Sequence, residues 1–210
     1  MAQFFAIHPV NPQPRLIRQA AQLVRDGAVI AYPTDSSYAL GCRIGDKEAL
    51  TRMRAIRQLD ERQLLALICR DLSEVAIYAR VNDRQFRVLK AATPGSYTFI
   101  LHATREVPKR LQHPNRRTIG VRVSPNAIVQ ALLHELGEPL VSSTLIMPGE
   151  SEPLTDAPDI RTRLERQVDL VIDGGIGGIV PTTLVQLTGD TPEITRLGKG
   201  SVEVFASLVE

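Results

Sequence analysis

A cluster of hydrogen-bonding side chains directly follows an apolar stretch near the start of the chain. In AYPTDSSYALG, residues 31–41, Thr34, Asp35 and Tyr38 stand with two serines immediately after the apolar run 28–32. Hydroxyl groups and a carboxylate at such a place suit a polar ligand, because ligands of α/β proteins gather at the ends of strands. A solvated loop is the alternative that this stretch, taken alone, leaves open.

Similar groups interrupt later apolar stretches. Ser142 and Thr144 lie in PLVSSTLI, Thr182 follows the glycine turn DGGIGG, and Arg122 stands in the middle of VRV. A charge within a buried strand is costly unless it is paired or faces a cavity, although strand alternation could equally turn Arg122 outward to solvent. Arginines and hydroxyls together suit a phosphate or a carboxylate.

Several other kinds of chemistry lack their sequence patterns. The chain contains no G-x-x-x-x-G-K-[ST], H-E-x-x-H or G-x-S-x-G motif, and its four histidines show no ligand spacing. Cys42 and Cys69 form no C-x-x-C pair and stand in apolar surroundings, which predicts buried, reduced thiols rather than a zinc site. The pattern therefore favours binding and orientation of anions over a catalytic triad.

Strands alternating with helices must position these groups. Apolar runs predict strands over residues 28–32, 64–70, 96–103, 118–123, 139–146, 168–173, 182–187 and 193–197. Helical spacing and capping residues predict helices over 15–26, after Asp46, after Ser73, after Asn82 and after Ser124-Pro125, and a short charged helix before residue 168. This order predicts an α/β protein with a mixed sheet.

Composition predicts one globular domain over residues 1–210. Hydrophobic residues make up 43% and charged residues 23%, and the net charge of +2 is too small to indicate a nucleic-acid-binding protein. Two basic runs could surround a phosphate-bearing ligand or contact RNA: Arg52, Arg54, Arg57 and Arg62, and Arg105, Lys109, Arg110, Arg116 and Arg117. No apolar stretch of about 18 residues and no secretory signal occurs, so we expect a cytoplasmic protein without a membrane span.

As a set, these segments resemble the motifs of the YrdC-like family, the threonylcarbamoyl-AMP synthase superfamily. YPTDSSYALG is similar to its Y-P-T-E-T-x-Y-G-L-G motif, and TPGSYTFIL to its W-P-G-P-x-T-x-x-L segment. IGVRVSPN resembles its V-R-x-P strand, and PLVSSTLIMPG its P-L-x-S-T-S-A-N-x-S-G run. GGIVPTTLVQLT and ITRLGKG resemble its glycine turn and terminal R-x-G. The matches run in order from about residue 15 to 200, and the details are most similar to the YciO branch.

The resemblance implies a YrdC-like twisted, mixed β-sheet flanked by helices around a large basic cavity. It also implies that ATP, L-threonine and bicarbonate condense to threonylcarbamoyl-AMP and pyrophosphate, usually with magnesium, for tRNA modification. The residues implied to bind threonine, carbamate or another part of the substrate are Thr34, Tyr38, Arg122, Ser142, Thr144 and Thr182. Those implied to bind nucleotide are Arg57, Thr98 and Arg196, with Arg57 also the candidate catalytic residue.

Two positions depart from the family pattern. The K-x-R pair that grips phosphates falls on Arg57-Gln58-Leu59, and Ile146 stands where the family has asparagine. Losing a charged donor costs roughly 1.5–3 kcal/mol of ligand stabilisation, unless Arg54 or Arg62 compensates. We therefore expect weak or changed synthase activity. The alternative is a non-catalytic protein of the same fold that binds double-stranded RNA, tRNA or rRNA through its basic rim.

Overall fold

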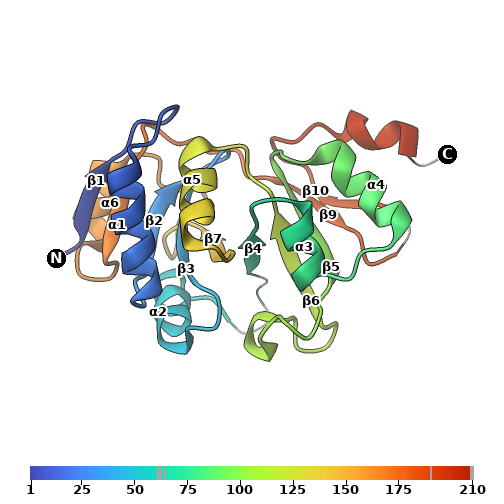
Figure 1. Cartoon of the computed structure of the whole chain (residues 1–210), viewed down its shortest axis with the longest axis horizontal. Helices are drawn as coiled ribbons and strands as arrows, with labels where there is room; N and C mark the ends of the chain where they lie inside the picture. Colours follow the sequence, from blue (N-terminus) through green and yellow to red (C-terminus); the bar gives the residue numbers. More distant parts are fainter. Residues whose placement is uncertain (61–62, 64, 190, 209–210) are drawn as a thin grey trace.

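The computed structural model describes residues 1–60, 63, 65–189 and 191–208, and a ten-stranded sheet runs through it (Figure 1). The strands are β1 (Gln3–Ala6), β2 (Ile30–Pro33), β3 (Tyr38–Arg43), β4 (Ala66–Ile68), β5 (Tyr97–His102), β6 (Thr118–Arg122), β7 (Leu140–Thr144), β8 (Leu170–Asp173), β9 (Thr183–Gln186) and β10 (Glu193–Arg196). Their order in the sheet is β1-β8-β2-β3-β7-β4-β6-β5-β9-β10, with parallel and antiparallel pairs. The predicted α/β fold with a mixed sheet is confirmed.

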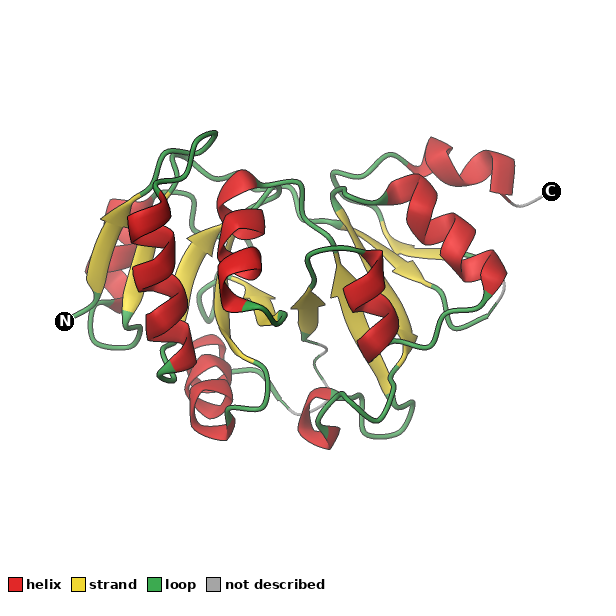
Figure 2. Ribbon diagram, in the orientation of Figure 1, coloured by secondary structure: helices red, strands yellow, loops and turns green. Residues whose placement is uncertain are grey.

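Helices cover both faces of this sheet (Figure 2), and alternate residues of β2, β3, β4, β7 and β8 supply the two cores. On one face, α1 (Pro14–Arg25) and α5 (Ala127–Leu136) pack against residues such as Ile30 and Leu140. On the other, α2 (Lys47–Arg57), α3 (Leu72–Tyr78), α4 (Asp83–Ala92) and α6 (Ala157–Leu164) pack against residues such as Leu40 and Val121. The short 3-10 helices η1 (Lys109–Leu111) and η2 (Val202–Leu208) complete the elements.

Two of the predicted helix caps are confirmed and two are wrong. Asp46 accepts the backbone N–H of Ala49 at the start of α2, and Asn82 forms a capping box with Gln85 at the start of α4. The cap of α3 is Asp71, because its carboxylate reaches the first turn while Ser73 already lies inside the helix. The cap of α5 is Asn126. Ser124, which we expected there, donates its hydroxyl to Asp35 instead.

The sequence pattern missed two strands. β1 lies at the sheet edge, and its residues are partly or fully exposed. β3 begins inside the hydroxyl cluster, so no apolar run marks where this strand starts. The predicted strand 64–70 is shorter, Ala66–Ile68, and its residue 64 lies outside the described residues. Within the described part of the chain, no helix is both long and apolar enough to cross a membrane.

Candidate anion-binding cavity

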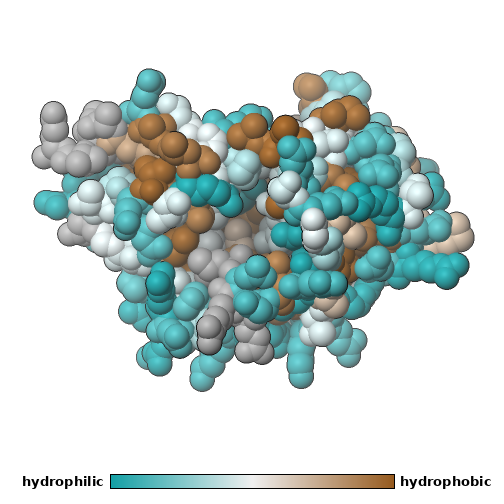
Figure 3. All heavy atoms as spheres, turned by 180° about the vertical axis from the view of Figure 1, so that it is seen from behind, coloured by the Kyte–Doolittle hydropathy of each residue, from teal (hydrophilic) through white to brown (hydrophobic). Residues whose placement is uncertain are grey.

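A row of small side chains hollows one face of the sheet. Gly41 of β3, Ser142 of β7, Ala66 of β4 and Gly120 of β6 are direct partners on successive strands. At Gly120 an added Cβ would lie only 3.3 Å from the carbonyl oxygen of Leu65. Because Ser142, Ala66 and Gly120 are small, the face holds a cavity of about 470 Å³, whereas the Tyr32 ring covers Gly41. The surface seen from behind is hollowed near its middle (Figure 3).

Most of the residues that the sequence predicts for the site line this cavity. They are Arg57 at the end of α2, Thr98 of β5, Arg122 of β6, Ser142 and Thr144 of β7, Thr182 before β9 and Arg196 of β10. The fold therefore brings together in one cavity side chains from separate segments of the chain. The prediction that Arg122 turns outward to solvent, the alternative left open by strand alternation, is wrong, because this residue is 7% exposed and lines the cavity.

The described lining carries three arginines and no carboxylate. Arg57 lies with its Nε 3.5 Å from the Oγ of Ser143, and Arg196 donates through Nη2 to the carbonyl oxygen of Thr182 at 2.9 Å. Burial lowers the pKa of both guanidinium groups. Partly desolvated cations that face a cavity attract an anion strongly, because little water screens them. The cavity therefore suits a phosphate or a carboxylate.

Hydroxyl groups pair with one another around these arginines. The Oγ1 atoms of Thr98 and Thr182 lie 2.8 Å apart, and the Tyr32 hydroxyl donates to the Oγ of Ser142 at 2.7 Å. Burial raises the pKa of Tyr32 to about 12, so this phenol stays protonated at neutral pH and acts as a donor. The Ser142 hydroxyl therefore accepts one hydrogen bond from within the sheet.

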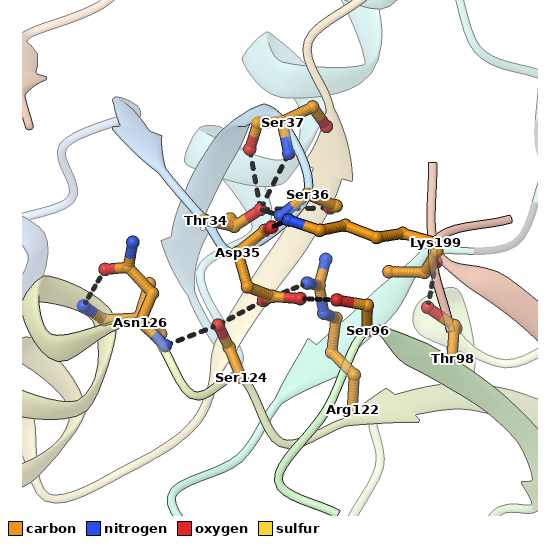
Figure 4. Close-up of polar contacts among 12 residues, drawn as sticks. Thr34, Asp35, Ser36, Ser37, Ser96, Thr98, Arg122, Ser124, Asn126 and Lys199 are labelled. Carbon is orange, nitrogen blue, oxygen red and sulfur yellow. Dashed lines mark hydrogen bonds and ion pairs between the residues drawn. The ribbon is translucent and has the colours of Figure 1, made fainter. Parts of the chain in front are cut away.

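Thr34 and Tyr38 shape the cavity from outside its described lining. Thr34 Oγ1 accepts the backbone N–H groups of Ser36 and Ser37 and donates to the carbonyl oxygen of Ser37 (Figure 4). This bonding folds the turn between β2 and β3, and it is Ser37 that reaches the cavity. Tyr38 donates its hydroxyl to the carbonyl oxygen of Gly175 at 2.8 Å and so anchors the glycine turn.

Arg122 is paired within the protein. Its Nη2 lies 2.6 Å from Oδ1 of Asp35, and both side chains are 8% exposed. The Nε of Arg122 is buried and has no hydrogen-bond partner among the described residues. Asp35 also accepts the hydroxyls of Ser96, at 2.7 Å, and Ser124 (Figure 4). One wall of the cavity thus carries a buried and charge-compensated arginine.

The carboxyl of Asp35 is held in its ionised form. Burial by itself raises its pKa, but the Arg122 guanidinium and the hydrogen bonds from Ser124 and Ser96 outweigh burial, and the pKa lies below the ordinary value of 3.8. A carboxylate with these partners has its acceptor positions occupied and a low proton affinity. Asp35 is therefore a poor general base.

A second wall of the cavity is apolar. Leu59 and Ile146 line it, as do Ile100 and Leu184. Arg54, considered from sequence as a compensating cation, instead donates to the carbonyl oxygen of Asp60 at 2.6 Å. The other compensating residue considered, Arg62, lies outside the described residues. Leu59 and Ile146, the two lining positions that depart from the family motifs, therefore place hydrophobic side chains where the motifs have arginine and asparagine.

The described residues do not fit a protein-held magnesium ion. They include no group of three His, Cys, Asp or Glu side chains that could hold a metal, and Asp35 is occupied by Arg122. Magnesium is commonly bound through substrate phosphates with one or two carboxylates. We therefore assign it no protein ligands here.

Sequence reasoning named Asp35 only as one of a cluster and gave it no role. The partners Ser96 and Ser124 were missed as well, because Ser96 begins a strand and Ser124 has the appearance of a helix cap. A usable signal was present: a buried arginine needs a counter-charge, and Asp35 is the acidic residue in the hydroxyl cluster. Ser151, which also lines the cavity, carried no signal.

Fold and site together define an α/β protein with a basic, hydroxyl-lined cavity whose chemistry suits an anion. The Sua5/YciO/YrdC family model, which carries the description telomere recombination, matches residues 22–198. The chain belongs to the Sua5/YciO/YrdC family, which confirms the resemblance seen in the sequence motifs.

Individual relatives agree with this placement. The uncharacterized protein YciO of Escherichia coli K12 is 54% identical over 205 residues, 98% of this chain and all of that protein. Its crystal structure matches with a TM-score of 0.94 over 98% of this chain and 100% of that one. The threonylcarbamoyl-AMP synthase of Chromobacterium violaceum is 35% identical over 181 residues, 85% of this chain and 92% of that protein. P. abyssi Sua5 complexed with L-threonine has the same fold, at 22% identity and a TM-score of 0.89 over 98% of this chain and 60% of that chain.

Proposed function

We propose that this protein binds L-threonine and an adenine nucleotide in the cavity and has threonylcarbamoyl-AMP synthase activity that is weak or altered. The observation that carries the proposal is a cavity whose described lining has three arginines, several hydroxyls and no carboxylate. Support comes from the 35% identical synthase and from the Sua5 structure with bound L-threonine. A cavity of this charge and size suits a ligand with phosphate and carboxylate groups.

The chemistry of the proposed reaction needs orientation more than a nucleophilic side chain. The threonine amine and bicarbonate form a carbamate with loss of water. A carbamate oxygen then bonds to the α-phosphorus of ATP while the bond between the α-phosphorus and its bridging oxygen to the β-phosphate breaks, and pyrophosphate leaves. Two anions must approach each other, so the site has to hold them in line and stabilise the charge that develops.

The positions of the lining residues suggest a division of roles. Arg57 and Arg196 have no acidic partner in the described structure, and we assign them to the phosphates. Arg122 and Ser142 both line the cavity, and we assign them to the threonine carboxylate or the carbamate. The paired hydroxyls of Thr98 and Thr182 would together orient the nucleotide. Thr34 and Tyr38 would act through the turn and the glycine loop that they hold.

The apolar wall is the reason to expect weak or altered activity. Leu59 and Ile146 cannot donate a hydrogen bond to a phosphate, and each missing hydrogen bond to this charged group costs roughly 1.5–3 kcal/mol. A loss of this size slows the reaction about tenfold or more per donor. The cavity can still bind an adenylate, which has a single phosphate to hold.

The test is to incubate the protein with ATP, L-threonine, bicarbonate and magnesium and to follow pyrophosphate and threonylcarbamoyl-AMP, with calorimetry of each ligand alone. We expect slow turnover, and binding weakened about tenfold or more in Arg57→Gln. Arg163→Gln is the matched control, because Arg163 pairs with Glu150 on the surface and lies outside the described cavity lining. No turnover and no binding of ATP or threonylcarbamoyl-AMP would disprove the proposal.

A second candidate function is RNA binding, and one observation favours it. Five cations are exposed on the segment between β5 and β6: Arg105, Lys109, Arg110, Arg116 and Arg117. Clustered cations bind the phosphates of double-stranded RNA, tRNA or rRNA with an affinity that falls steeply with salt. Replacing Arg116 and Arg117 with glutamine should weaken duplex RNA binding and lower its salt dependence by about two charges. Equal binding by wild type, this variant and Arg163→Gln would exclude a specific role for the segment.

A further inference from the structure

Asp35 and Arg122 meet although their strands are far apart in the sheet. Three strands, β3, β7 and β4, lie between β2, which Asp35 follows, and β6, which Arg122 ends. At about 4.8 Å per strand, β2 and β6 would be roughly 19 Å apart in a flat sheet. The two side chains nevertheless lie 2.6 Å apart. The curl of the sheet and the turn after β2 therefore bring these residues together beside the cavity.

Asp35 forms a cluster with Arg122, Ser124, Ser96 and Lys199 (Figure 4). All four partners come from the part of the sheet that β6, β5, β9 and β10 form. Arg122 ends β6, Ser124 follows it, and Ser96 precedes β5. Lys199, after β10, donates to the main-chain carbonyl oxygen of Asp35. One residue thus ties the turn after β2 to three separate segments on the other side of the cavity.

The same cluster controls where the Arg122 guanidinium can lie. An unpaired arginine side chain has many rotamers, and fixing them costs conformational entropy. Asp35 removes this freedom before any ligand arrives, which is the condition for tight and directional binding. Asp35 is absent from the described cavity lining, and so is Ser96. Neither residue is therefore placed to contact a ligand there directly.

We propose that Asp35 is the positioning residue for Arg122, that Ser96 and Ser124 hold the Asp35 carboxylate for this purpose, and that the cluster sets the affinity of the cavity for the amino-acid substrate. The proposal rests on the proposed function, in which Arg122 binds the threonine carboxylate or the carbamate. It differs from a purely structural role, because it requires residues that touch no ligand to change the affinity for threonine more than that for ATP.

The experiment compares wild type with Asp35→Asn, Asp35→Glu and the double variant Ser96→Ala/Ser124→Ala. Calorimetry gives the affinities for threonine and ATP separately, and urea denaturation confirms that each variant is folded. We expect Asp35→Asn and the double serine variant to weaken threonine binding by about tenfold. Their ATP binding should stay within about twofold of wild type. Asp35→Glu should bind threonine more tightly than Asp35→Asn, because it keeps the carboxylate. Glu138→Gln, which breaks the exposed Arg43–Glu138 pair, is the matched control.

A second readout needs no ligand. The guanidinium signals of 15N-labelled arginine, assigned with Arg122→Lys, report whether Arg122 is held or rotates freely. In wild type, we expect the Arg122 signals of a guanidinium that is held in place. In Asp35→Asn, we expect signals that are averaged by rotation of this group. Unchanged threonine affinity in folded Asp35→Asn and in the serine variant would overturn the proposal, as would unchanged Arg122 signals in Asp35→Asn. If wild type binds no threonine, the proposed function fails, and the signals alone then decide whether Asp35 positions Arg122.

Discussion

The hydroxyl of Tyr32 reaches Ser142 across an intervening strand. Tyr32 lies in β2 and Ser142 in β7, with β3 between them, yet their oxygens are 2.7 Å apart. The contact is possible because β3 presents Gly41 at this point, where an added Cβ would lie 2.7 Å from Cε1 of the Tyr32 ring. A glycine in one strand thus lets a tyrosine from its neighbour orient a cavity hydroxyl in the next.

Gly41→Ala should therefore destabilise the protein, because the new methyl group displaces the buried Tyr32 ring. Overpacking of this kind costs about 1–3 kcal/mol of unfolding free energy, measured by urea denaturation. Gly189→Ala is the matched control, since a Cβ at Gly189 meets nothing within 4 Å. Equal stability of the two variants would show that the Tyr32 ring can move without cost.

Filling the hollow of the sheet should block the ligand while the protein stays folded. Ala66→Leu places a large side chain on the cavity floor between Ser142 and Gly120. We expect ATP binding by calorimetry to fall by about two orders of magnitude, because the added volume occupies the space of the nucleotide. Ala66→Ser, of nearly native size, should bind as wild type does. Full binding by Ala66→Leu would place the nucleotide elsewhere.

Restoring the family donors should strengthen the proposed activity. In Leu59→Arg/Ile146→Asn, a guanidinium and an amide replace two hydrophobic side chains of the cavity lining. With roughly 1.5–3 kcal/mol for a charged donor, we expect pyrophosphate release from ATP to rise about tenfold or more. The isosteric control is Leu59→Met/Ile146→Leu. If the double variant is no faster than this control, the apolar wall is not what limits the reaction.

Acid should remove a defined part of the stability through Asp35. Burial alone raises the pKa of this carboxyl, but Arg122 and the serine hydroxyls lower it below 3.8 overall. A lowered pKa in the folded state means that the stabilisation is complete above 3.8 and is lost as the pH falls through the folded value. In urea denaturation between about pH 5 and pH 2, wild type should lose more unfolding free energy than Asp35→Asn. A difference between the two proteins that does not change with pH would contradict this account.

The two thiols should be unreactive in the folded protein. Cys42 and Cys69 are buried and free, and burial raises the pKa of Cys42 to about 12 and that of Cys69 well above its ordinary value. Thiolate is the reactive form, so a thiol reagent at about pH 8 should label neither residue before unfolding and both in urea. Labelling of the native protein at a rate independent of urea would indicate that one cysteine is exposed.

The sequence predicted the α/β class, the mixed sheet and most helices, because these depend on local apolar periodicity. It did not predict β3, since a six-residue strand that begins inside a hydroxyl cluster has no local signature. The prediction that Ser124 caps a helix was wrong for a related reason. Its hydroxyl has two possible partners, a helix end and a carboxylate distant in sequence, and only the second can be known from the fold.

For the candidate cavity too, the sequence did not predict contacts between residues that are distant in the chain. The motif positions of Arg57, Arg122 and Arg196 converge on one cavity because the resemblance covers the chain in order. The pairing of Asp35 with Arg122 depends instead on how four successive strand pairings curl the sheet. Such long-range geometry accumulates from small twists between neighbouring strands, and single-residue patterns do not record it.

The pairing of β1 with β8 has a consequence for how the protein is made. Gln3 lies opposite Leu170, and β2 also pairs with β8. At roughly 5–20 residues per second, a ribosome needs on the order of 10 s after producing the first strand before its partner emerges. During that interval one edge of β2 lacks its neighbouring strand and leaves backbone N–H and C=O groups unpaired. Synthesis from the N-terminus therefore cannot complete this half of the sheet stepwise, and the open edge of β2 is a site for aggregation until the last third of the chain is available.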